Sequence, residues 1–182
     1  MKMRAARLRA APADASIRQL LSIIDQAYNR PSWHGTNLRG SLHRVSEEQA
    51  AWRPGPGRHN IWELAVHAAY WKYAAARRFI TPPPARGSFP LKGSNWFPRS
   101  AGESGDLARA WRTDIALLDE MHEALRNVVM GLSQQDLGRT PAGKKVSNFA
   151  VLSGAAAHDL YHAGQIQLLK RLSPRRSHDG GS

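Results

Sequence analysis

Two histidines near the end of the chain, His158 and His162, lie four residues apart in a segment with helical periodicity. Residues with this spacing project from the same face of a helix, one turn apart. Two imidazoles placed in this way can hold one divalent metal ion, with nitrogen–zinc distances of about 2.0–2.1 Å. Because a pair leaves the coordination incomplete, a third ligand has to come from another helix.

His67 is the candidate for this third ligand, because it lies on the apolar side of another predicted helix. It keeps register with Leu64 rather than with Lys72, which we expect to face solvent. A buried imidazole without a partner would cost roughly 1–3 kcal/mol, so His67 needs a ligand or a hydrogen bond. We predict a metal site formed by His67, His158 and His162, and a core histidine satisfied by a hydrogen bond is the alternative for His67.

The other histidines are weaker candidates. His34 follows a break between two helical pieces, where it could act as an acid/base next to the metal or help to cap the helix that follows. The remaining histidines are predicted at the surface or in turns, and they are His43, His59, His122 and His178.

Three neighbours of the histidine pair also carry expectations. Tyr161 is expected in the core, and Gln165 is placed to hydrogen-bond near the site. Gly164 costs about 1 kcal/mol relative to alanine inside a helix, and a close helix contact would explain its presence.

The donor set decides what chemistry such a site could support. Three neutral imidazoles leave the charge of the ion uncompensated and leave coordination positions open. Water on zinc can reach a pKa near 7, which supports hydrolysis, whereas a bound thiol would lose its proton. The chain has no cysteine, which excludes disulfides, a cysteine nucleophile and thiolate ligands, so any thiol has to come from a small molecule. Imidazole suits several ions, and we expect zinc or nickel, with iron or manganese as alternatives.

The elements that must position these histidines are predicted to be helices. Apolar periodicity predicts four long helices, over about 14–28, 60–80, 105–132 and 147–172. A connection rich in Pro, Gly and Ser follows the second of these, and its aromatics Phe89, Trp96 and Phe97 favour a loop packed across the other elements. The sequence therefore predicts an all-α four-helix bundle with one long crossover loop.

Composition and charge bound the domain organisation. We expect a basic leader over 1–13, a single domain over 14–172 and a disordered tail over 173–182. No run approaches the roughly 20 apolar residues that cross a bilayer, and no apolar segment follows the basic start, so we expect a cytoplasmic protein. The net charge of +12 would attract anions. Nucleic-acid binding is disfavoured, because the basic residues are dispersed without a helix-turn-helix or stacking signature.

The histidine pattern also resembles a known family. His67, followed far along the chain by His158-Asp-Leu-Tyr-His162-Ala-Gly-Gln-Ile, is similar to the DinB/YfiT-like superfamily, and the likeness covers roughly Ser16 to Leu172. It implies a four-helix bundle in an up-down-down-up arrangement. The matching positions imply one metal ion held by the three histidines, with the remaining coordination positions left to water or substrate. It also implies a homodimer.

Activity is implied by the resemblance rather than by the residues. The superfamily includes bacillithiol S-transferases and mycothiol-dependent isomerases, which implies a metal-dependent S-transferase acting with a low-molecular-weight thiol and a small-molecule substrate. A metal-dependent hydrolase and a non-catalytic metal-binding stress-response protein are the alternatives. The resemblance implies no DNA-binding surface.

Overall fold

The computed structural model describes residues 14–80, 87–100 and 105–174, and every regular element in these ranges is a helix. The all-α prediction is therefore confirmed. None of the described helices is both long enough and apolar enough to cross a membrane. The predicted leader over 1–13 lies outside the described residues, and so do residues 175–182 of the predicted tail.

The four predicted long helices are present and differ from expectation only at their ends. In chain order the elements are α1 (Ala15–Tyr28), α2 (Leu38–Ser41), α3 (Glu47–Ala51), α4 (Ile61–Ala76), the 3-10 turn η1 (Arg77–Phe79), α5 (Leu107–Met130), α6 (Gln134–Gly138) and α7 (Asn148–Leu172). The sequence does not predict α6, because a helix of five residues is too short to show a repeating pattern of apolar residues.

Each long helix begins at a polar side chain that satisfies its first backbone donors. Asp14, Asn60, Asp106 and Ser147 each accept a hydrogen bond from a backbone N–H two or three residues further on. Such a cap stabilises a helix by about 1 kcal/mol and fixes where it starts. The start of α4 at Asn60 sets the register that places His67 in the middle of that helix.

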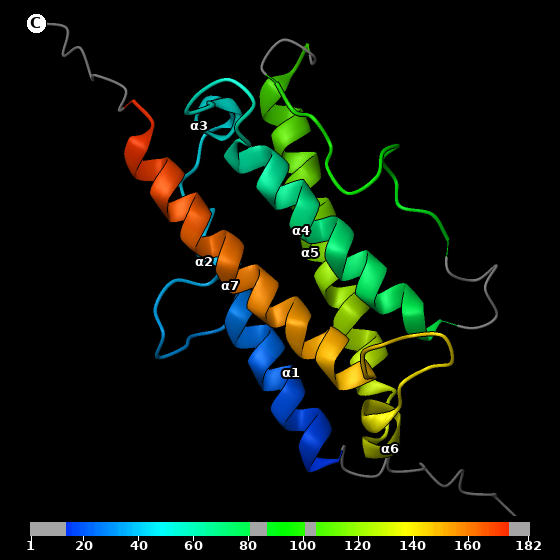
Figure 1. Cartoon of the computed structure of the whole chain (residues 1–182). Coiled ribbons are helices and arrows are strands. Elements are labelled where there is room, and N and C mark those ends of the chain that lie inside the picture. The colour runs from blue at the N-terminus through cyan, green and yellow to red at the C-terminus, as the bar shows by residue number, and fades with distance from the viewer. Residues whose placement is uncertain (1–13, 81–86, 101–104, 175–182) are drawn as a thin grey trace, which may run out of the picture.

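The four long helices pack in a closed ring. α4 contacts both α5 and α7, and α1 contacts both α7 and α5. Figure 1 shows α1 and α7 side by side and α4 next to α5. One apolar cluster, which includes Trp62 and Leu118, joins α4 to α5, and a second, which includes Ile24 and Leu152, joins α1 to α7.

The crossover between α4 and α5 packs on the bundle, as predicted from its aromatics. Phe97 is fully buried, and Phe89 and Trp96 pack against the cluster that joins α4 to α5. Residues 81–86 and 101–104 of this connection lie outside the described residues. The crossover is thus a structural layer over α4, and it brings Trp96 to the helix that carries His67.

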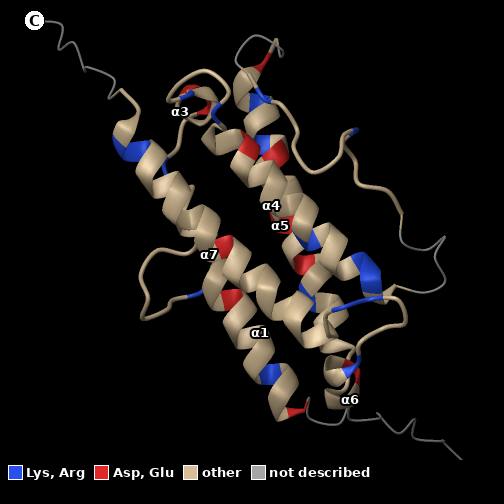
Figure 2. Ribbon diagram, viewed as in Figure 1, with Lys and Arg blue, Asp and Glu red and all other residues tan. Residues whose placement is uncertain are grey.

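The prediction that Lys72 faces solvent is wrong. Of the 16 residues in α4, 12 are buried, because α5, α7 and the crossover surround the helix and leave it little solvent face. Lys72 is 1% exposed, and its ammonium group donates to the buried carboxylate of Asp159 on α7. Asp159 is the only acidic residue on α7, whose two basic residues lie at its C-terminal end (Figure 2). A helix enclosed on most sides has no polar stripe, so periodicity misplaces its single lysine.

His122, predicted at the surface or in a turn, is also buried, at 1% exposed. Its ring stacks on Tyr28 with a centroid distance of 3.9 Å. Burial, followed by the charge of Lys72, lowers the pKa of His122 to about 3. The ring is therefore neutral at physiological pH and packs as an aromatic core residue.

We expect Lys72→Met to destabilise the protein by about 3–5 kcal/mol, because it leaves the Asp159 carboxylate buried without its cation. The double variant Lys72→Met/Asp159→Leu should recover most of this loss, since it removes both charges. Urea unfolding followed by circular dichroism measures both. A single variant within about 1 kcal/mol of the wild type would contradict the ion pair's role.

Candidate metal centre

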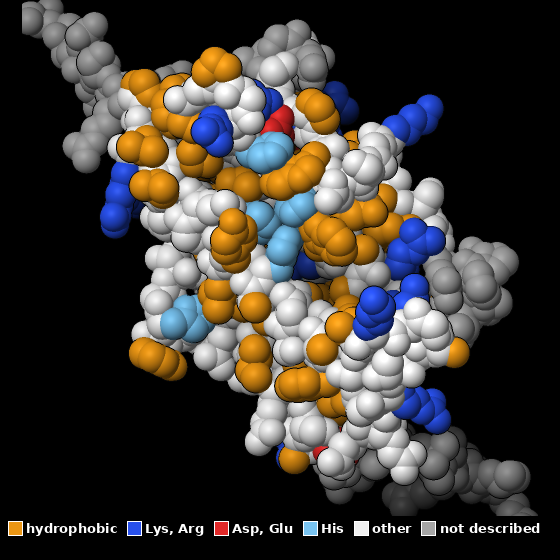
Figure 3. All heavy atoms as spheres, in the orientation of Figure 1, with side chains coloured by type: hydrophobic (Ala, Val, Ile, Leu, Met, Phe, Trp, Pro, Cys, Tyr) orange, Lys and Arg blue, Asp and Glu red, His pale blue; other side chains and the backbone are white. Residues whose placement is uncertain are grey.

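The three predicted histidines come together between α4 and α7. His67 projects from α4, and His158 and His162 project from successive turns of α7. The Nε2 atom of His158 lies 3.3 Å from that of His67 and 3.0 Å from that of His162. One nitrogen from each ring lies within 4.8 Å of the others. Figure 3 shows histidine side chains gathered in the middle of this face, bordered by hydrophobic side chains.

The orientation of His67 is fixed by the crossover. Its Nδ1 lies 2.6 Å from the backbone carbonyl oxygen of Asn95. Because a carbonyl oxygen only accepts hydrogen bonds, Nδ1 carries the proton and Nε2 keeps its lone pair. The ring is 6% exposed. A hydrogen bond to one nitrogen thus prepares the other as a metal ligand, as is usual for histidine in metal sites.

His162 is oriented in the same manner from within its own helix. Its Nδ1 donates to the side-chain oxygen of Gln165 at 2.6 Å, which leaves Nε2 unprotonated. Gln165 in turn donates from Nε2 to the hydroxyl of Tyr161 at 3.3 Å. The expectation that Gln165 hydrogen-bonds near the site is confirmed.

The protonation states fit a cation better than a network of hydrogen bonds. Nε2 of His67 and Nε2 of His162 are both acceptors, so a proton on His158 could satisfy only one of its two close contacts. The lone pair of the other Nε2 would then face His158 without a donor. A divalent ion at the centre would satisfy all three nitrogens at once.

The three rings are also held neutral, which is the form that binds metal. Burial lowers the pKa of His67. Burial and the neighbouring rings of His162 and His67 lower the pKa of His158 to about 3. Burial lowers the pKa of His162 to about 4, although its bond to Gln165 opposes the shift. At neutral pH no ring is charged, so the site presents three lone pairs without electrostatic repulsion toward a cation.

A stack of three parallel rings supports the site from the crossover side. Trp96 lies between His67, at a centroid distance of 3.8 Å, and His59, at 3.6 Å. Nδ1 of His59 is 2.8 Å from the carboxylate of Glu63. Burial acts to raise the pKa of Glu63, but bonds from Arg53, His59 and the Arg99 backbone lower it overall. The ionised carboxylate thus anchors His59, on the far side of Trp96, and the Arg99 end of the crossover that covers His67.

Some site residues were missed by sequence reasoning. Tyr161, expected in the core, is 64% exposed, and its ring lies 5.1 Å from that of His162. His59 is exposed as predicted, but its stack on Trp96 has no signal in sequence spacing. A Cβ added at Gly164 would meet nothing within 4 Å, so the close helix contact expected there is wrong.

His34 lies apart from this arrangement. It is exposed in the connection between α1 and α2, and its described side-chain contact is with the hydroxyl of Ser32, at 3.3 Å. Asn37 caps α2 by accepting from the Gly40 backbone, so the capping role considered for His34 is filled by another residue.

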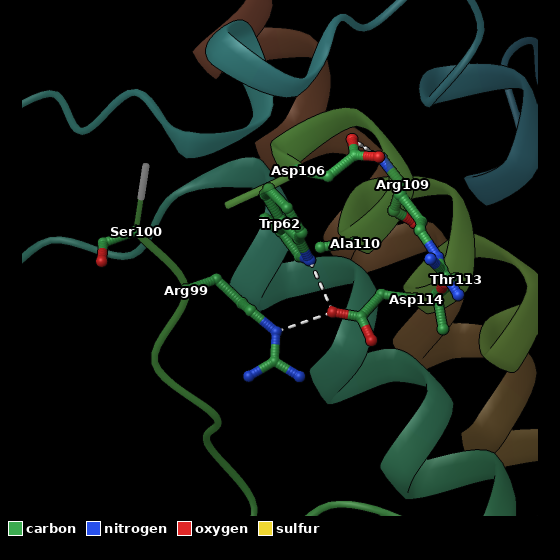
Figure 4. Close-up of a pocket in the computed structure, with 8 residues that line it drawn as sticks. All are labelled: Trp62, Arg99, Ser100, Asp106, Arg109, Ala110, Thr113 and Asp114. Atoms are coloured by element: carbon green, nitrogen blue, oxygen red, sulfur yellow. Dashed lines mark hydrogen bonds and ion pairs between the residues drawn. The ribbon is translucent and has the colours of Figure 1, made fainter. Parts of the chain in front are cut away.

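A cavity of about 420 Å³ borders the site at His162. Its volume falls in the range of small-molecule sites. A larger cavity, of about 530 Å³, lies at the start of α5 and is lined by none of the three histidines (Figure 4). In that cavity Trp62 and Arg99 both donate to Asp114, at 2.7 and 2.6 Å. The buried negative charge of Asp114 is therefore already paired. The cavity at His162 is therefore the one placed to serve a metal.

Comparison with known proteins supports the same reading. A family model described as the DinB superfamily matches residues 32–166, which include all three histidines. No curated protein and no solved structure matches the chain. The family match covers well over half of the 182 residues. Its extent and the convergence of the three imidazoles agree with the resemblance seen in the sequence, and this chain belongs to the DinB superfamily.

Proposed function

We propose that this protein is a metal-dependent S-transferase that uses a low-molecular-weight thiol, with its ion held by His67, His158 and His162. The observation that carries the proposal is the convergence of three neutral Nε2 atoms beside a cavity, in a chain without cysteine. Such a site has open coordination positions, and an outside molecule has to supply the sulfur. Zinc or nickel suits the all-nitrogen donor set, with iron or manganese as alternatives.

The residues of the chain divide the work of this reaction. When bound, the ion supplies the positive charge that lowers the pKa of a thiol and makes it a nucleophile. Asn95 and Gln165 hold two of the imidazoles in the ligand tautomer. Trp96 covers one face of His67 and shields it from water. Tyr161 is exposed with its ring beside that of His162, and its hydroxyl, which accepts from Gln165, can donate a hydrogen bond to a substrate.

The same open site would also support hydrolysis, and this is the rival enzymatic function. A non-catalytic metal-binding stress-response protein is the second rival. We favour transfer to a thiol because apolar side chains, among them Leu64, Leu168 and Leu169, line much of the cavity. An apolar cavity suits the carbon skeleton of an electrophile better than a site built to activate water.

The proposal also covers the helix directions, the oligomeric state and the cellular location. An up-down-down-up order of helix directions is supported by the long crossover, which allows α4 and α5 to run the same way. A homodimer is supported by apolar side chains exposed on α7, namely Leu160, Leu168 and Leu172. A cytoplasmic location would provide reduced thiols.

We expect purified wild-type protein to contain about one divalent metal ion per chain, and His67→Ala to lose it, because two ligands on one helix hold an ion weakly. Elemental analysis measures both. His43→Ala, an exposed histidine outside the site, is the matched control and should retain its metal. Metal content well below one ion per chain in wild type, or full content in His67→Ala, would refute the site.

Gln165→Leu should weaken metal binding by about 10- to 100-fold, because it removes the hydrogen bond that fixes the tautomer of His162. Tyr161→Phe is the matched control, since it leaves that hydrogen bond intact and should bind metal like wild type. Competition with a chromophoric chelator measures the affinities. Equal affinity in all three proteins would show that Gln165 does not orient the ligand.

We expect the metal-loaded protein to accelerate conjugation of 2-mercaptoethanol to 1-chloro-2,4-dinitrobenzene. In this step a sulfur–carbon bond forms while the carbon–chlorine bond breaks, chloride leaves with the bonding electrons, and the thiol proton passes to solvent. His158→Ala and metal removal should each abolish the acceleration, whereas His43→Ala should not. Ester cleavage without any thiol would favour the hydrolase, and metal binding without either activity would favour the non-catalytic protein.

A further inference from the structure

The cavity beside His162 is built from two kinds of wall. One wall is apolar and comes from α4, α7 and the crossover, with Leu64, Leu168 and Trp96 among its residues. The turn before α4 adds Arg58 and His59 to the lining, and the His59 ring stacks on Trp96. A ligand that fills this space would therefore meet both hydrophobic carbon and basic nitrogen.

The charge at the rim comes from Arg58. No carboxylate is found among the residues that line the cavity, and His59 is engaged by Glu63. Arg58 is exposed, and within the part of the chain that the structure describes its guanidinium forms no ion pair. The cavity thus has an unopposed positive charge at its mouth.

The backbone of this turn is nevertheless fixed. The carbonyl of Arg58 accepts a hydrogen bond from the Arg53 guanidinium at 2.6 Å, and its N–H donates to the Gly55 carbonyl at 3.3 Å. Arg53 is held in turn by the buried carboxylate of Glu63. An arginine on an anchored turn keeps its guanidinium near the cavity while its end stays available to a ligand.

We propose that the cavity selects organic molecules that carry a carboxylate, with the carboxylate paired to Arg58 and the apolar body against α7. This inference rests on the proposed function for its reactive partner, because the other end of such a ligand would lie at His162. Arginine recognises a carboxylate through two parallel hydrogen bonds, which makes it a better selector than a lysine would be. The carboxylate could belong to the electrophile or to the thiol.

Binding of matched probes to the metal-loaded full-length protein tests this proposal. The pair 4-phenylbutanoate and 4-phenylbutanamide represents the electrophile, and 3-mercaptopropanoate and 3-mercaptopropanamide represent the thiol. Calorimetric titration measures each affinity. We expect the acid of at least one pair to bind about fivefold tighter than its amide, which is the upper end for an exposed ion pair. The pair that shows the preference identifies which substrate carries the carboxylate.

Variants assign the preference to its source. Arg58→Gln should bind acid and amide equally, and Arg58→Lys should retain part of the preference. Arg112→Gln is the matched control, because it removes the same charge from an exposed position on α5 that does not line this cavity. A preference that survives Arg58→Gln would overturn the proposal, since the carboxylate would then sit on the metal. The absence of any preference in wild type would overturn it as well.

The outcome can be separated from that of the proposed function. Arg58-dependent binding of the acid without turnover on any electrophile would uphold the carboxylate site and refute the transferase. Thiol conjugation without a preference for the acid would uphold the transferase and refute the carboxylate site.

Discussion

The contact between α4 and α7 is the constraint on which the site depends. Two polar interactions cross it, the cluster of three imidazoles and the buried pair of Lys72 with Asp159. Asp159 follows His158 directly, and Lys72 lies little more than one turn beyond His67, so both interactions fix the same register. A slip of one residue would separate the ligands and also leave a charge buried without its partner.

The long connection between α4 and α5 completes the site rather than merely joining helices. Asn95 sets the tautomer of His67. Trp96 stacks on the His67 ring, and His59 stacks on Trp96 in turn. This segment is held at its far end by Glu63, which also sits in the first turn of α4. One buried carboxylate therefore ties the start of the ligand-bearing helix to the loop that orients the ligand.

Local rules predicted the features that depend on a single helix. The spacing of His158 and His162 and the cap at Asn60 follow from helical geometry alone. The surroundings of Lys72 could not be predicted, because periodicity assumes one solvent face and α4 has almost none. His122 lies on α5 four residues after the buried Leu118, so its burial follows the apolar stripe of that helix, and the prediction that placed it at the surface overlooked this. The prediction that Tyr161 lies in the core was wrong because the part of α7 around Tyr161 is not covered by another helix and borders the cavity. The stack on Trp96 joins residues from separate segments, so no local pattern encodes it.

The residues that orient the metal ligands differ from those that select the substrate. Asn95 orients His67 from the crossover, whereas Gln165 orients His162 and also lines the cavity. The residues that a ligand would meet, Arg58 and Tyr161, are exposed. Tyr161 accepts a hydrogen bond from Gln165, whereas Arg58 is held by contacts within its own turn, with Arg53 and Gly55. Because Arg58 forms no hydrogen bond with Asn95 or Gln165 in the part of the chain that the structure describes, substitutions at Arg58 could alter substrate choice while the metal stays bound. A rigid pair of helices with a variable rim would let one metal site serve different substrates.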